Sequence, residues 1–531
     1  MGGGRAPPAP DAQRSEGKDV KWRLAEWALL TLLSCLAASY ILFAMAHPIK
    51  YGLSVLMAFF IMSFVALARG EVSGRRVRLS PRLRLLASPL LLFLSAALLA
   101  MYVADAHIWY IRTALAVLVA YTVPGYALIE FVGLPKRELG FLEKLCFSFA
   151  YSLSLAFLLS LALAPSGPWL CGLVIAGLSL SLSILLVIKM LGEVRAGRWR
   201  QEPLVADLGE LLAIALSCST ILLVIAYFYP AMTERLGLDI IEVSRHISVW
   251  LRTPELMTAV YPGFVLSEAA SFILSDGSPE VFQSSLVFLN IYLVFFFLLL
   301  ARKVLGRADP RLPPLALLLF TFFAGLGWLY ISINLPPLGG MSHGEVMKVV
   351  AEKTYMDVRQ GGMVDFILWF RPRSVALLLL FITIYSLLAY EPTGWRYRLN
   401  IGFLSASLFF MHVVEYLLLA ASLLPLAFFR ISSAMRLDEA VGGLLCSWPF
   451  VGLVYALSWA YGYTSLTMMC PLSLMLVLTA LYSGALAFLR LSRRRLAIGR
   501  AWPRRLARFS VLAVGFLYLS SMMAWLDQVG G

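Results

Sequence analysis

Long runs of apolar residues, each about as long as a membrane is thick, recur along this chain and limit what it can fold into. A helix needs about 20 apolar residues to cross a hydrocarbon core of about 30 Å. Such runs occupy residues 24–46, 50–68, 83–103, 107–132, 142–165, 168–190, 208–230, 281–301, 312–334, 371–390, 440–462, 466–489 and 507–526. We therefore expect an all-α, polytopic transmembrane bundle of about 14–15 membrane segments, with short juxtamembrane helices in its outer loops.

The composition leaves little room for a soluble domain. Hydrophobic residues make up 60% of the chain and charged residues 14%, whereas about one quarter of an average soluble domain is charged. All six cysteines fall within apolar runs and show neither CxxC nor Cys/His spacing. We therefore expect reduced, buried thiols, and neither disulfides nor a zinc site.

Basic residues gather in short loops and predict the orientation of the chain. The loop from Arg69 to Arg84 holds six arginines against one acid, Glu71. Loops of this kind stay on the cytoplasmic side, next to anionic lipid. Counting crossings from this loop also puts the basic stretches 189–200 and 302–311 inside. The net charge of +14 thus indicates membrane lipids as partners, and not nucleic acid.

The same count predicts the domain organisation of an integral, multi-pass cell membrane protein. We expect a disordered cytoplasmic tail (1–23) followed by a six-helix membrane module (24–200). A second membrane module (201–490) comes next, and a basic loop with the last transmembrane helix (491–531) ends the chain. The N-terminus should lie in the cytoplasm and the C-terminus outside. The two longest polar connections, 231–280 and 335–370, should face outward.

One apolar stretch, 399–429, is too short for two full crossings. Because the later run of arginines must lie inside, we predict two short or re-entrant helices with a turn near residues 411–415. His412 and Glu415 fall at this turn, where ionisable groups are costly and usually face a cavity or a partner. They either approach the outer acidic residues or form a hydrogen-bonded pair that stabilises the turn.

A dense group of ionisable residues follows the apolar run 208–230. If this segment is helical, Asp239, Glu242 and His246 share one face, with Arg245 beside them. Two carboxylates and an imidazole could accept a proton, hold a divalent cation or hydrogen-bond a sugar. They could equally form a solvated helix end.

A second short helix is predicted between Tyr261 and Gly277, with Pro near its start and Gly at its end. It is too short to span a membrane and fits an interfacial position. A crossing followed by two such helices, the first bearing an acid, resembles the GT-C superfamily of integral membrane glycosyltransferases. The resemblance runs through Tyr261-Pro262-Gly263 and the segment Trp369-Phe370-Arg371-Pro372-Arg373, and covers roughly residues 208–490.

The resemblance implies transfer of a sugar from a polyprenyl-phosphate donor to a lipid, glycan or protein on the extracytoplasmic side. Asp239 matches the catalytic base of the family, with Glu242 as the alternative and His246 in support. Arg371 and Arg373 would neutralise the leaving phosphate, or they only snorkel at a helix end. Further substrate-binding candidates are Arg245, Asp365, His412 and Glu415. The closely paired acids of the family are replaced here by Asp239-x-x-Glu242. We therefore assign no metal ligand and no cofactor, and leave open whether the site binds a divalent cation.

Two other functions remain open at the level of the sequence. A transporter or flippase of a lipid-linked or anionic substrate would use His412 and Glu415 as intramembrane coupling groups. The sequence has no internal repeat of the transporter type, which counts against this function. The third hypothesis is that the protein is a non-catalytic subunit of an envelope complex. The sequence predicts neither the sugar nor the oligomeric state.

The first membrane module contains a motif of its own. Val123-Pro124-Gly125-Tyr126-Ala127-Leu128, followed by Leu142-Glu143-Lys144-Leu145, resembles a motif of poorly characterised prokaryotic, especially archaeal, membrane proteins, which implies no activity. We expect Pro124 and Gly125 to kink a helix. Arg112 and Glu130, near opposite ends of the same run, are expected to snorkel.

Overall fold

The structure is a computed structural model that describes residues 49–70, 72, 76–79, 82–106, 108–135, 139–196, 204–232, 245–249, 262–277, 281–306, 308–323, 372–390, 394–413, 415–419 and 445–462. All structural statements concern these residues. The predicted spans 24–46, 466–489 and 507–526 lie outside them, so the total number of membrane segments stays a prediction.

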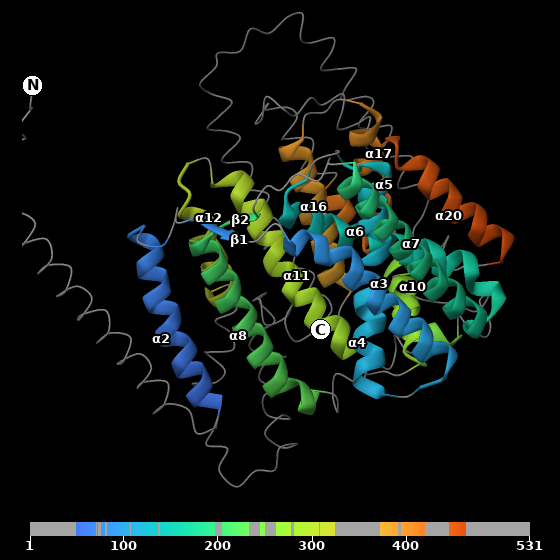
Figure 1. The fold of residues 1–531 in the computed structure, drawn as a ribbon, viewed down its shortest axis with the longest axis horizontal. Coiled ribbons are helices and arrows are strands. Elements are labelled where there is room, and N and C mark those ends of the chain that lie inside the picture. The colour runs from blue at the N-terminus through green and yellow to red at the C-terminus, as the bar shows by residue number, and fades with distance from the viewer. Residues whose placement is uncertain are drawn as a thin grey trace, which may run out of the picture.

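The described chain is an all-α bundle, as the apolar runs predict (Figure 1). Its helices are α2 (Ile49–Ala68), α3 (Arg82–Val103), α4 (Trp109–Ala120), α5 (Val123–Val132), α6 (Phe141–Leu163), α7 (Pro168–Arg195), α8 (Leu208–Met232), α10 (Pro262–Leu274), α11 (Val281–Val304), α12 (Leu312–Phe323), α16 (Pro372–Ala389), α17 (Trp395–Met411) and α20 (Trp448–Ala460). A short 3₁₀ turn, η1 (Ala164–Ser166), joins α6 to α7. The only strands in the described part are β1 (Arg76–Leu79) and β2 (Leu204–Asp207), which pair antiparallel.

Five segments are long and apolar enough to cross a membrane, which fits an integral membrane protein. They are Leu86–Val103, Ile111–Val132, Phe141–Leu163, Pro168–Arg195 and Ser284–Val304. Large apolar side chains stay exposed on the outer helices, for example Phe93 on α3, Ile188 on α7 and Trp459 on α20. Such surfaces are favourable against lipid tails, and they would be unfavourable in water.

Helix α6 runs through the interior of the bundle and contacts α5, α10, α11, α16, α17 and α20. Most of its side chains are buried, including Phe147, Phe149 and Phe157. The Tyr151 hydroxyl donates a hydrogen bond to Asn400 Oδ1 on α17 at 2.5 Å. This contact joins helices that lie far apart in the sequence, since the two residues are 249 positions apart.

The basic loops gather at one end of the bundle, which we call the basic end. There β1 pairs with β2, and Arg302 at the end of α11 forms an ion pair with Glu210 at the start of α8. Arg311 Nη1 donates to the Ala68 carbonyl at the end of α2, at 3.1 Å. The described parts of these loops thus lie on one side, as counting crossings predicts.

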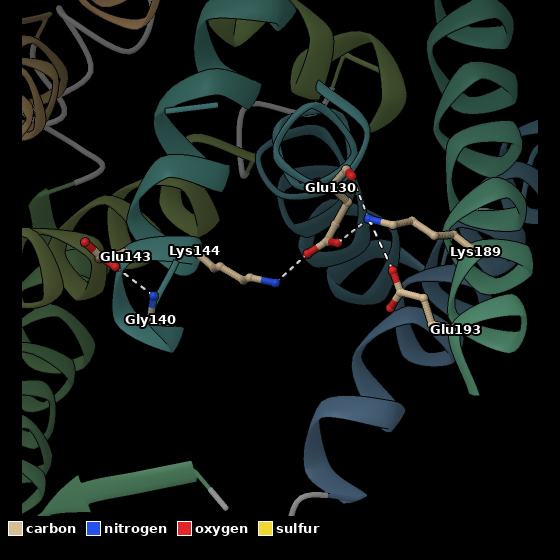
Figure 2. A network of polar contacts seen from close by, with 6 residues as sticks. All are labelled: Glu130, Gly140, Glu143, Lys144, Lys189 and Glu193. Carbon is tan, nitrogen blue, oxygen red and sulfur yellow. Dashed lines mark hydrogen bonds and ion pairs between the residues drawn. The ribbon is translucent and has the colours of Figure 1, made fainter. Parts of the chain in front are cut away.

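An ion network fixes three helices at the basic end (Figure 2). Lys144 Nζ on α6 lies 2.5 Å from Glu130 Oε1 on α5, and Lys189 Nζ on α7 lies 2.7 Å from Glu130 Oε2. Lys189 also donates to the Glu130 carbonyl oxygen at 2.5 Å and lies 3.8 Å from Glu193. The Glu130 side chain is only 18% exposed, so it is held by two lysines and does not snorkel to water as expected.

The run 107–132 is interrupted near Pro124 and Gly125, where a kink is predicted. Two helices meet there, α4 and α5, and Gly125 lies directly against α6. A Cβ at Gly125 would sit 1.9 Å from the carbonyl oxygen of Ser148, so only glycine fits. Gly125 N donates a hydrogen bond to Ser152 Oγ (2.7 Å), and Ser148 Oγ donates one to the Thr122 carbonyl (2.8 Å). Both bonds join the residues around the break to α6.

Candidate functional site

Helix α10 lies inside the bundle and not at its surface. The predicted short helix exists, and it is followed by Asp276 and Gly277 in the left-handed conformation. All thirteen of its residues are buried, however, among α4, α6, α7 and α17. An interfacial helix needs one polar face, and α10 has only small or apolar residues apart from Glu268 and its serines. The interfacial placement is therefore corrected to an interior one.

The start of α10 packs directly on the end of α17. A Cβ at Gly263 would lie 2.6 Å from the carbonyl carbon of Phe410 and 2.8 Å from the amide nitrogen of Met411. One turn further on, Ser267 Oγ lies 3.9 Å from Met411 Sδ. Gly263 therefore lies against the residues that directly precede His412.

His412 and Glu415 form a pair where α17 ends. The helix stops at Met411, and His412 has an extended backbone with φ −161° and ψ 110°. His412 Nδ1 contacts Glu415 Oε2, and the Glu415 side chain is 0% exposed. The helix is interrupted at this position and helical residues follow at Val413 and from Glu415 to Leu419, while the predicted re-entrant turn stays a prediction. Of the two alternatives for these residues, the contact within the pair is observed. Their approach to the outer acids is not tested, since those acids lie outside the described residues.

The predicted catalytic set is only partly described. Asp239, Glu242, Asp365 and Arg371 lie outside the described residues. Arg373 belongs to the backbone of α16, but its side chain is not described. Arg245 and His246 begin a helical turn at residues 245–249, with Arg245 exposed, His246 half-buried and Ile247 buried.

Glu268, in the middle of α10, is a candidate that sequence reasoning missed. Its Oε2 accepts a hydrogen bond from Ser285 Oγ on α11 at 3.1 Å and lies 3.4 Å from Ser271 Oγ. The Tyr121 hydroxyl, at the end of α4, lies 3.5 Å from Ser271 Oγ. The available signal is the single charge within Pro262–Leu274, because an ionisable residue at membrane depth is a functional candidate by default.

Arg112 ties the far end of α10 to α4, opposite the basic end. Its Nε donates to the Leu274 carbonyl at 3.0 Å, and its Nη1 lies 3.4 Å from Asp105 Oδ1. Its side chain is 4% exposed, so it does not snorkel as expected. The guanidinium provides a donor for a carbonyl that has no partner within the helix at the C-terminal end of α10. Its positive charge also compensates the negative end of the helix dipole.

The remaining groups give no further site in the described residues. Cys146, Cys171, Cys218 and Cys446 are free thiols. Within the same residues, no three His, Cys, Asp or Glu side chains are grouped to hold a metal ion. Neither a known protein family, nor a curated protein, nor a solved structure matches this chain. Its function has to be inferred from its own residues.

Proposed function

We propose that this protein is a membrane glycosyltransferase that transfers a sugar from a polyprenyl-phosphate donor to a lipid, glycan or protein acceptor on the extracytoplasmic side. The supporting observation is the packing of Gly263 on Phe410 and Met411. This packing places Gly263 against the residues that directly precede His412, which pairs with Glu415. The predicted outer loop that contains Gly263 also carries the acids Asp239 and Glu242 along the sequence, which supports a reaction centre that uses these acids together with the pair.

The proposed chemistry uses the residues of the two outer loops. Asp239, or Glu242 in its place, takes the proton of the acceptor hydroxyl as this oxygen attacks the anomeric carbon. Arg371 and Arg373 neutralise the phosphate that leaves with its prenyl chain. His246 supports the base, while Arg245, Asp365 and the pair His412–Glu415 contact the sugar or its lipid.

Asp239→Asn tests the proposal. With purified protein in liposomes and a panel of short-chain prenyl-phosphate sugars, the transfer rate should fall by about 10²–10⁴-fold, the range of a lost general base. Asp309→Asn is the matched control, because Asp309 lies beside Arg311 at the basic end and should leave the rate unchanged. A donor-dependent transfer that persists at full rate in Asp239→Asn would refute the assignment of the base.

A transporter or flippase is the second candidate, and the burial of Glu415 favours it. A carboxyl at 0% exposure beside an imidazole can relay protons across an apolar bundle. This function would appear as movement of a prenyl-phosphate lipid across liposomes that requires a proton gradient and is lost in Glu415→Gln. Transfer of sugar without a gradient would exclude it as the main activity.

A further inference from the structure

The Glu268 carboxyl is buried without a charged partner among the described residues. The residue is 0% exposed and forms no ion pair there with Lys, Arg or His. Arg112, on the neighbouring helix α4, directs its guanidinium instead to the Leu274 carbonyl and Asp105. A lone carboxylate in an apolar interior is unfavourable, so the group needs either a proton or a bound cation.

The atoms around this carboxyl are oxygens from three helices. Ser271 Oγ donates its proton to the backbone carbonyl of Glu268 at 2.9 Å, which leaves lone pairs of this oxygen free. Ser285 Oγ lies on α11, and the Tyr121 hydroxyl lies 3.5 Å from Ser271 Oγ. Glu268 Oε1 accepts no hydrogen bond from the described residues. A further ligand can therefore bind at this oxygen.

We propose that Glu268, Ser271, Ser285 and Tyr121 form a binding site for a sodium ion. Hard cations prefer oxygen ligands such as carboxylates, hydroxyls and carbonyls. One carboxylate neutralises one positive charge, whereas a divalent cation would leave a net charge buried. When sodium binds, the protonated carboxyl releases its proton to water and the carboxylate ligates the ion. This site is independent of the glycosyltransferase proposal.

The position of the site allows exchange with one side of the membrane. Glu268 precedes Leu274 by six residues, which corresponds to about 9 Å along the helix axis. At Leu274 the chain reaches Arg112 and the exposed carboxylate of Asp105. Sodium would enter from this end, opposite the basic end.

Carbodiimide labelling of the full-length protein tests the site. Dicyclohexylcarbodiimide reacts with protonated carboxyls in apolar surroundings, and mass spectrometry locates the adduct. The rate at Glu268 should fall about tenfold when sodium is raised to ten times its Kd, because occupancy competes with protonation. Choline at equal ionic strength should have no effect. Glu415, which already contacts His412, is the internal comparison and should be insensitive to sodium.

Variants separate a sodium site from a protonated carboxyl. Ser285→Ala and Tyr121→Phe remove a ligand oxygen and keep Glu268, so labelling should continue while protection by sodium weakens. Ser183→Ala, at a buried serine paired with Ser95, is the matched control and should keep the full protection. Equal labelling in sodium and choline, no adduct at Glu268, or unchanged protection in both ligand variants would each overturn the proposal.

Discussion

At Gly125, a single missing Cβ allows α5 to lie against α6. Small residues matter in this way in membrane bundles because helices there associate through close packing and hydrogen bonds. The sequence indicates a break at Pro124 and Gly125, but a kink and a helix contact look alike in one sequence. The partner atoms, on Ser148 and Ser152, decide between them.

Gly125→Ala should therefore destabilise the protein. The methyl group overlaps the Ser148 carbonyl, and forcing extra volume into a packed core costs about 1–3 kcal/mol. Thermal unfolding in detergent should show a lower midpoint than wild type. Gly177→Ala on α7 is the control, since its Cβ would meet nothing within 4 Å. Equal midpoints for the two variants would show that the approach of α5 to α6 is looser than described.

At the scale of elements, polar side chains fix the helices at both ends of the bundle. Glu130 joins α5 to α6 and α7 at the basic end. At the opposite end, Arg112 joins α4 to α10. The sequence predicts the ends of these helices well, because charges mark where an apolar run stops. It does not predict the partners, and it therefore assigns both residues to snorkelling.

Glu130→Gln should loosen the three helices that it joins. The change leaves Lys144 and Lys189 without their shared carboxylate, at a cost of about 1–2 kcal/mol for a partly screened pair of contacts. The melting midpoint should fall. Glu193→Gln is the comparison, because Glu193 is more exposed and lies 3.8 Å from Lys189. A larger loss for Glu193→Gln than for Glu130→Gln would contradict the role of Glu130.

At the scale of the whole molecule, the described loops sort into a basic end and an opposite end. Asp309 and Arg311 mark the first, and Asp105 with Arg112 marks the second. From the positive-inside rule, we predict that the basic end faces the cytoplasm. On this orientation, the first outer loop with Asp239 and Glu242 is predicted to lie on the extracytoplasmic side.

Cysteine accessibility measures this orientation directly. In a variant without its native cysteines, Asp105→Cys should react with a membrane-impermeant maleimide in intact cells. Asp309→Cys should react only in inverted vesicles. Labelling of Asp309→Cys from outside would reverse the topology and remove the basis for an extracytoplasmic active site.

Among the described residues, the sequence by itself determined the apolar helices, most of their ends and the grouping of the basic loops, because run length and loop charge are local properties of the chain. Only the tertiary structure decided that α10 is interior and that Glu268 contacts Ser285. It also decided that Arg112 meets Leu274, 162 positions away. Such contacts depend on how helices distant in sequence pack, and hydropathy carries no information about which helix faces which.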